Sequence, residues 1–254
     1  MGNSISPLVS VIMPAYNSER YIGEAIVSVL AQTFPEWELV VVDDCSNDGT
    51  ACIAKRFSES DARVKVVLMS ENGGVAAARN RGIAEACGAY VALLDSDDLW
   101  EPDKLELQVA LAERSGAPIV YCSYDLISQD GQDVGKPFVV PPVTDFEAML
   151  EKSVISCSTC LISTEIMKTH PFSNEFHHED YVLWMTLLRE GYAACGCSEV
   201  LMHYRQIPGS RSSDKIKSAK GRWEAYRKGL GMPIGKSLAS FVRYAVSGVR
   251  KYHG

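Results

Sequence analysis

The sequence predicts an α/β fold: a single Rossmann-like, mostly parallel sheet flanked by helices, followed by a C-terminal helical tail. Short β-branched runs alternate with helix-like segments through the first half of the chain, which is the pattern of β-α-β units. These runs are almost continuously apolar, as expected for parallel strands buried on both faces. A chain of 254 residues with 46% hydrophobic residues can bury the core that such a domain needs.

Four strands and three helices are predicted in the first half. The strands are residues 9–13, 39–42, 64–69 and 90–94. The helices are residues 21–32, 50–57 and 75–86, because apolar residues recur at helical spacing in the first and Ala and Arg dominate the last.

The second half is less regular. Residues 131–142 contain three prolines and predict a loop, residues 181–190 predict a helix that starts near 177–180, and residues 201–205 predict a short strand. We expect the main domain to cover residues 1–213, with halves at 1–115 and 116–213, and a basic amphipathic helical tail to cover residues 214–254.

The tail differs from the rest of the chain in charge. Residues 214–254 contain ten Lys or Arg and two Asp or Glu, so they carry +8 and the remainder carries −15. Its predicted helix, residues 236–252, gathers apolar side chains on one face: Leu238, Phe241, Val242, Ala245, Val246, Val249 and Tyr252. This face, with Trp223 and Tyr226, either rests on an anionic membrane or packs on the domain or on a second subunit.

Targeting and membrane-spanning signals are missing from the sequence. No apolar stretch approaches the ~20 residues that span a bilayer, and residues 1–7 lack the features of a secretory signal. The eight cysteines are expected to be reduced core thiols, with a zinc site at Cys157, Cys160, Cys195 and Cys197 as the alternative.

Polar clusters follow the predicted strands of the first half. They are residues 14–17, 43–46, 71–74 and 95–98. Because ligands bind beyond the carboxyl ends of parallel strands, we expect these four clusters to meet at one edge of the sheet.

The acidic run Asp95-Ser96-Asp97-Asp98 is the strongest chemical signal. Clustered carboxylates repel one another, and a hard divalent ion that also binds phosphate oxygens would relieve this repulsion. The alternative is that Asp97 and Asp98 cap the helix near Pro102. The pair Asp43-Asp44 is ambiguous in the same way, since it suits either hydrogen bonds to a nucleobase or ribose or an Asx-turn in the loop that follows.

Five collinear segments resemble the motifs of the family 2 glycosyltransferases. They are residues 9–17 (VSVIMPAYN), 32–34 (QTF), 42–50 (VDDCSNDGT), 72–82 (NGGVAAARNRG) and 95–98 (DSDD). The resemblance covers about the first 115 residues. It implies the GT-A fold, transfer with inversion, a UDP-sugar or similar donor, and Mn²⁺ or Mg²⁺ as cofactor.

The resemblance also implies roles for single residues. Ala15 and Tyr16 are expected to line the nucleobase pocket, with Pro14 in the same donor-binding segment, and Asp44 is expected to hold the base.

Within the later motifs, Asp95 is expected beside the ribose, Ser96 in the same donor-binding run, and Asp97 as the metal ligand. Arg79 either touches the donor or braces its loop. The halves 1–115 and 116–213 then become the nucleotide-sugar-binding and acceptor-binding halves.

The catalytic base of the family lies in an acidic pair that opens a helix, and Asp180 in the segment His178–Trp184 matches it. A carboxylate there would take the proton of the acceptor hydroxyl. Charge at a helix N-terminus is a compatible structural role for Glu179 and Asp180. His177 and His178 either contact phosphate or acceptor, or serve as surface or capping residues.

One position departs from the family pattern. Relatives often carry a histidine two positions after the late Tyr204-Arg205, where this chain has Ile207. Arg205, Ser210, Arg211 or Ser212 would have to bind phosphate in its place, and strand alternation puts His203 on the face of Arg205.

The sequence therefore predicts an inverting, metal-dependent glycosyltransferase of bacterial surface-polysaccharide (O-antigen or capsule) synthesis, with a nucleotide-sugar donor and a glycan or polyprenyl-diphosphate-linked acceptor. We expect it in the cytoplasm, at the inner face of the plasma membrane, with no nucleic-acid partner. The alternatives are a nucleotidyltransferase of similar fold and a non-catalytic nucleotide-sugar-binding protein. A dehydrogenase is disfavoured because no G-x-G-x-x-G follows the first strand. Acceptor choice should depend on residues 122–160.

Overall fold

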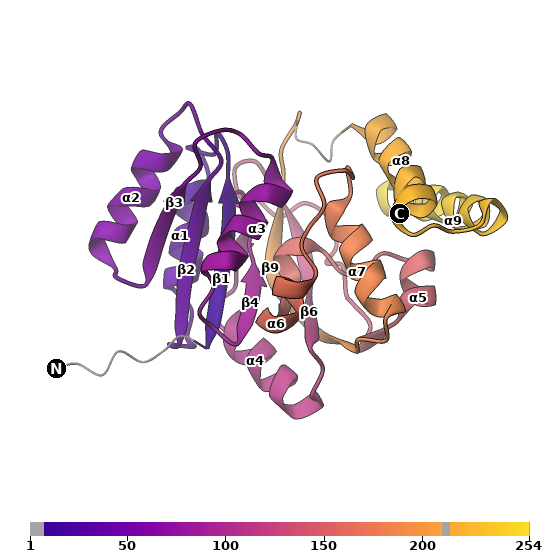
Figure 1. Cartoon of the computed structure of the whole chain (residues 1–254), viewed down its shortest axis with the longest axis horizontal. Helices are drawn as coiled ribbons and strands as arrows, with labels where there is room; N and C mark the ends of the chain where they lie inside the picture. Colours follow the sequence, from indigo (N-terminus) through magenta and orange to yellow (C-terminus); the bar gives the residue numbers. More distant parts are fainter. Residues whose placement is uncertain (1–7, 210–213, 254) are drawn as a thin grey trace.

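The computed structural model describes residues 8–209 and 214–253 and shows one central sheet with helices on both faces (Figure 1). Eight strands follow the order β3-β2-β1-β4-β8-β6-β9-β5, and β7 pairs with β9. The strands are β1 Val9–Ala15, β2 Trp37–Asp43, β3 Val64–Leu68, β4 Tyr90–Leu93, β5 Leu99–Trp100, β6 Ile119–Ser128, β7 Val143–Thr144, β8 Leu161–Ser163 and β9 Ala194–Gln206.

The helices are α1 Ile22–Leu30, α2 Thr50–Ser60, α3 Val75–Glu85, α4 Lys104–Ser115, α5 Phe146–Glu151, α6 Thr164–Thr169, α7 Glu179–Arg189, α8 Lys215–Glu224 and α9 Ile234–His253. A 3₁₀ turn covers Cys157–Thr159, and a π-helical turn, Ala225–Gly229, continues α8. No helix in the ranges that the structure describes is both long enough and apolar enough to cross a membrane.

Parallel pairing dominates the first half of the sheet, as predicted. β1 pairs in parallel with both β2 and β4, and β2 with β3. Antiparallel β8 joins β4 to β6, so that β6 and β9, themselves parallel, extend the sheet into the second half.

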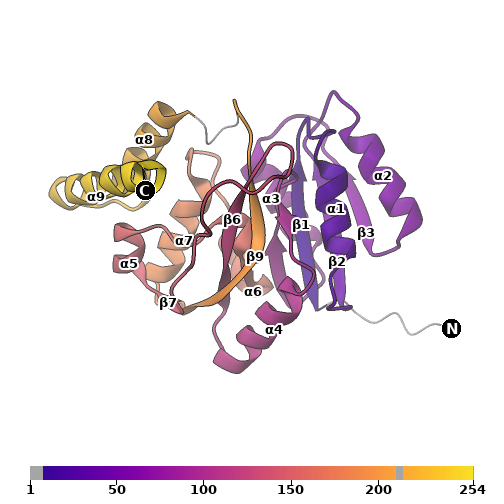
Figure 2. The same cartoon turned by 180° about the vertical axis from the view of Figure 1, so that it is seen from behind.

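Two apolar cores cover the two faces of the sheet. On β1, Ile12 faces the core packed by α3, α6 and α7, whereas its neighbours Val11 and Met13 face the core packed by α1 and α4. Figures 1 and 2 show these two helix layers from opposite sides. Burial on both faces explains why the strands have no alternating polar residues.

The four strands and three helices predicted in the first half are confirmed, and the loop at 131–142 carries only isolated bridges at Asp133 and Phe138. The short strand predicted at 201–205 is wrong in length, because β9 runs from Ala194 to Gln206. Its first half, Ala194–Glu199, contains no β-branched or aromatic residue and is held by pairing with β6 and β7.

Helix α3 lies very close to β1 and β2 at Gly82. A Cβ added there would lie 2.5 Å from Cγ2 of Ile12 and 3.1 Å from Cγ2 of Val42. Both neighbours are fully buried, so the helix can reach its position only with glycine at this point.

We predict that Gly82→Ala lowers the free energy of unfolding by about 1–3 kcal/mol through overpacking. Gly23→Ala is the matched control, because the nearest atom to its added Cβ is 3.9 Å away and alanine favours helix by up to about 1 kcal/mol. Urea denaturation of both variants measures the difference, and equal stability would contradict the close approach.

Candidate active site

The polar strand ends meet at one edge of the sheet, as predicted. Asp44 N–H donates to Ala15 O at 2.8 Å, and the Asn72 side-chain amide donates to Asp44 O at 3.2 Å. The Ser96 and Ser18 hydroxyls lie 2.8 Å apart. These contacts join the loops that follow β1, β2, β3 and β4 into one surface.

Asp44 uses its carboxylate to shape the predicted nucleobase pocket. It accepts hydrogen bonds from the N–H groups of Gly73 (2.7 Å) and Gly74 (2.8 Å), which pins the glycine loop against the end of β2. Turn-type bonds in the loop that follows β2 are made by Asp43, which accepts from Ser46 N–H at 3.1 Å, and by Asp48, which accepts from Thr50 N–H at 3.0 Å. Within the pair Asp43-Asp44, the turn alternative therefore holds for Asp43 and not for Asp44.

The end of β1 and the residue after it carry the other side chains that were predicted for the nucleobase pocket. Pro14 and Ala15 are the last residues of β1, and Ala15 is buried. Tyr16 follows with 47% of its surface exposed, which leaves its ring available to a base. Asp43, which pairs with Ala15 between β1 and β2, has its Oδ1 atom buried without a hydrogen-bond partner among the described residues.

The four residues of the acidic run have different environments. Asp98 is turned inward and buried, where it accepts from the Ser158 hydroxyl (2.6 Å) and from Arg205 N–H (3.0 Å). Burial, and then the nearby charges of Asp97 and Asp95, raise the pKa of Asp98. The capping alternative is wrong, because α4 starts at Lys104 and its N-cap is Asp103, which makes no side-chain cap bond.

Asp97 is the residue of the run that suits a cation best. Burial, and next the charge of Asp95, raise the pKa of Asp97 to about 6, which a divalent ion would reverse. Within residues 8–209 and 214–253 no group of three or more His, Cys, Asp or Glu forms a complete metal cage. An acidic run without a complete protein cage fits a metal ion that takes most of its ligands from water and phosphate oxygens, as Mg²⁺ does.

Arg79 ties the acidic run to the helix of the predicted base. Its guanidinium lies 2.6 Å from Asp95 Oδ1 and 2.8 Å from Glu179 Oε1, with 4% of its side chain exposed. Burial by itself lowers the pKa of Arg79, but the carboxylates of Asp95 and Glu179 outweigh it and raise the pKa. In this structure Arg79 braces the loop, one of its two expected roles.

The predicted base lies in the first turn of α7. Glu179 is buried and faces Arg79, whereas Asp180 is partly exposed and accepts from Tyr181 N–H at 2.7 Å. The acidic pair thus divides into one residue that holds the turn and one that remains accessible.

Helix α8 packs directly on this turn. The Arg222 guanidinium lies 3.6 Å from the centre of the Tyr181 ring, and His178 Nε2 is 2.9 Å from Ser218 O. Burial, and next the charge of Arg222, lower the pKa of His178 to about 4, so at neutral pH it is an uncharged donor to that carbonyl. His178 is therefore no phosphate ligand here.

Arg205 is not available to replace the missing histidine. Only 1% of its side chain is exposed, and it contacts Asp97 O (2.8 Å), Gln129 O (3.2 Å) and Glu24 (2.7 Å). Through its bond to Asp97 O, Arg205 holds the backbone of the acidic run. Ser210, Arg211 and Ser212 lie outside the described residues. His203 lies between Asp125 and Glu101.

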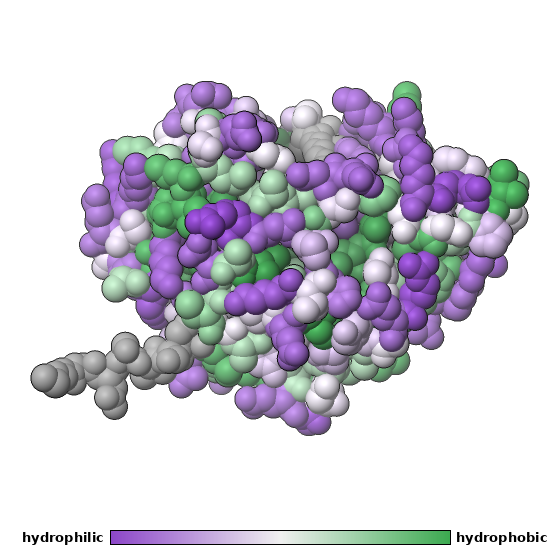
Figure 3. Space-filling model, viewed as in Figure 1, coloured by the Kyte–Doolittle hydropathy of each residue, from purple (hydrophilic) through white to green (hydrophobic). Residues whose placement is uncertain are grey.

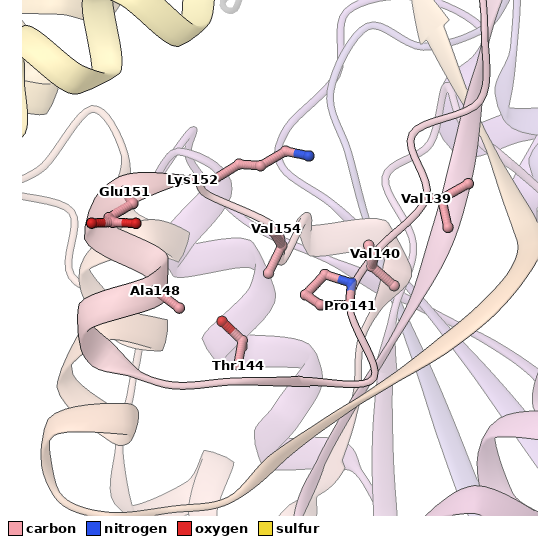
Figure 4. Close-up of a pocket in the computed structure, with 8 residues that line it drawn as sticks. All are labelled: Val139, Val140, Pro141, Thr144, Ala148, Glu151, Lys152 and Val154. Atoms are coloured by element: carbon pink, nitrogen blue, oxygen red, sulfur yellow. The ribbon is translucent and has the colours of Figure 1, made fainter.

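A hollow of about 450 Å³ lies in the part of the chain that was expected to bind the acceptor (Figure 4). It is lined by Val139, Val140, Pro141, Thr144, Ala148, Glu151, Lys152 and Val154. None of the predicted site residues lines it, although it falls within residues 122–160, where acceptor choice was expected to be decided.

Comparison with known proteins identifies the class. The family model for glycosyl transferase family 2 matches residues 10–169, and this chain belongs to that family. The chain is 39% identical to TuaG of Bacillus subtilis, assigned to teichuronic acid biosynthesis, over 96% of this chain and 97% of that protein. It is 36% identical to the Escherichia coli UDP-Glc:α-D-GlcNAc-diphosphoundecaprenol β-1,3-glucosyltransferase WfgD, over 96% and 95%.

Solved structures show the GT-A fold. Staphylococcus aureus TarS with UDP-GlcNAc matches with a TM-score of 0.73 and 26% identity, over 86% of this chain and 64% of that longer one. A Pyrobaculum calidifontis mannosyltransferase with GDP-Man and Mn²⁺ matches in fold, with a TM-score of 0.71 and 22% identity over 95% and 70%.

We predict that Arg79→Met lowers the free energy of unfolding by about 3–5 kcal/mol, because it leaves buried Glu179 without this counter-charge. Adding Glu179→Met should recover part of the loss. Arg81→Met is the control on the same helix: its pair with Glu85 is exposed, at 51% and 42% of the side chains, so we expect less than about 1 kcal/mol. Chemical denaturation distinguishes the buried bridge from the surface pair.

A second prediction concerns Asp97 in the absence of metal. Because the folded-state pKa is raised to about 6, ionisation of Asp97 disfavours the folded state above pH 6. Asp97→Asn should therefore raise the free energy of unfolding at pH 8 by on the order of 2 kcal/mol. The gain should shrink as the pH falls through 6 towards 4.

Thermal unfolding in chelator across this pH range tests the prediction, with Asp103→Asn, at an exposed position, as the control. A destabilised Asp97→Asn protein at pH 8 would contradict the electrostatic account of this residue.

Proposed function

We propose that this chain is an inverting glycosyltransferase that moves a sugar from a UDP-sugar to a glycan or polyprenyl-diphosphate-linked acceptor in bacterial surface-polysaccharide synthesis. The observation that carries the proposal is the Arg79 bridge, which holds the acidic run and the Asp180 turn on the two sides of one buried charge. The names of TuaG and WfgD support the acceptor class, and the TarS complex supports the donor class.

The proposed chemistry uses residues from both halves. Tyr16 and Asp44 bind the nucleobase side of the donor, and Asp95, Ser96 and Asp97 lie along its ribose and diphosphate. Asp97, with few other protein ligands, would hold Mn²⁺ or Mg²⁺, which supplies positive charge to the leaving diphosphate. Asp180 takes the proton as the acceptor oxygen bonds to the anomeric carbon and the carbon–oxygen bond to the diphosphate breaks.

A lipid-linked acceptor places the enzyme at the cytoplasmic face of the plasma membrane, reached through residues 214–254. A homodimer is the alternative use of that segment.

We predict different kinetic losses from two substitutions. Asp180→Asn should lower kcat by about 10²–10⁴, the contribution of a general base, while the donor still binds. Asp97→Asn should lower activity and, in addition, weaken donor binding. It should therefore abolish the rise in melting temperature that a UDP-sugar with Mn²⁺ gives to the wild type by mass action. Release of UDP and thermal shift are measured in parallel, with Asp103→Asn as control.

Three results would overturn the proposal. Full activity in both variants would remove the site assignment. Release of pyrophosphate in place of UDP would identify a nucleotidyltransferase, and donor binding without turnover across a panel of acceptors would identify a binding protein.

A further inference from the structure

Helix α9 turns part of its apolar face away from the protein. Ile234, Leu238 and Val242 are 67%, 57% and 54% exposed, and at ~100° per residue they lie within an arc of about 80°. We call these three side chains the α9 stripe. Figure 3 shows hydrophobic side chains at the right-hand edge of the molecule, over the start of α9, next to hydrophilic ones.

Another side of α9, next to the stripe, is already docked. Ser237 and Ser240 are buried, and Phe241 packs edge-on against Trp223 of α8 at 5.8 Å between ring centres. Salt bridges from Lys236 to Glu147 (2.6 Å) and from Arg243 to Glu151 (3.4 Å) fasten the helix to α5.

This arrangement is the reverse of an ordinary surface helix, which buries its apolar stripe and exposes its polar side. Here serines and aromatic rings face the domain while aliphatic side chains face outward. The sequence alternative in which the whole apolar face packs on the domain is therefore wrong for Leu238 and Val242. Tyr226, expected at the same face, is buried against the ring of Tyr181.

Charge favours an anionic occupant for the stripe. Residues 214–254 carry ten Lys or Arg against two Asp or Glu, whereas the rest of the chain is acidic. In a two-fold dimer the same patch meets itself, so two basic segments would be brought together. An anionic bilayer instead offers hydrocarbon to the stripe and negative headgroups to exposed basic side chains of the segment such as Lys217 and Lys228, which are 76% and 71% exposed, whereas Lys236 and Arg243 are paired with α5.

We propose that the α9 stripe is a docking surface for an anionic phospholipid bilayer, on which α9 lies parallel to the membrane. The proposal rests on the proposed function in one respect, because a polyprenyl-linked acceptor is held in such a bilayer. Since α8 connects α9 to the turn of Asp180 through Ser218 and Arg222, docking brings the acceptor side of the site to the membrane surface.

The test compares vesicle binding of the full-length wild type with that of a Leu238→Gln/Val242→Gln variant. Both positions are exposed, so folding should be retained, and the substitutions leave the charge unchanged. The matched control is Val27→Gln/Leu68→Gln, which removes two apolar side chains of similar exposure, 52% and 50%, from α1 and β3 at the other end of the molecule (Figure 1).

We expect the wild type and the control to bind phosphatidylglycerol–phosphatidylcholine vesicles and to bind pure phosphatidylcholine weakly. The stripe variant should lose at least about tenfold in partition coefficient on the mixed vesicles. Its UDP release with a water-soluble acceptor fragment should equal that of the wild type, because the stripe does not contribute to the donor site.

Equal vesicle binding by the stripe variant and the wild type would overturn the proposal. So would light scattering that shows a wild-type dimer which the stripe substitutions convert to a monomer, since the occupant would then be a second copy. If the wild type instead released no UDP with any acceptor while the stripe variant still lost vesicle binding, the proposed function would fail and the docking surface would stand.

Discussion

The structure depends on one buried positive charge, the guanidinium of Arg79, placed where two segments bring carboxylates together. Parallel strands deliver Asp95 to the ligand-binding edge of the sheet, and α7 delivers Glu179 from the other half of the chain. Helix α7 could not hold Glu179 at this depth alone, because an unpaired buried charge costs several kcal/mol, whereas 32% of the Asp95 side chain is exposed. The salt bridges of 2.6 and 2.8 Å therefore join the two halves at the point where donor and acceptor are proposed to meet.

Other contacts leave Asp97 as the acid of the run with a moderate, raised pKa. Asp95 is paired with Arg79, and Asp98 is held inside by Ser158 and by Arg205 N–H. Arg205 also donates to Asp97 O, so the backbone of the run is held by contacts within the protein. A carboxylate that is held in place but unfavourably charged is well suited to a metal–diphosphate pair, because binding removes an electrostatic cost.

The C-terminal segment is part of the site rather than an appendage. Its first helix stacks Arg222 on Tyr181, the residue after the proposed base, and it bonds to His178. Its second helix is fastened to α5 and turns aliphatic side chains outward. The proposed docking surface on α9 and the Asp180 turn are thus both connected to α8.

The sequence by itself determined the mostly parallel sheet and the gathering of four polar loops, because continuous apolar strands and local turn chemistry are encoded by near neighbours, and its family motifs predicted roles for Asp44, Asp97 and Asp180. Only the tertiary structure decided what Arg79, Asp98 and Arg205 do, since each meets partners between 16 and 181 residues away in the chain. The same holds for the full length of β9 and for the side of α9 that is buried. Periodicity identifies an apolar face, but the surface that covers it is set by the rest of the fold.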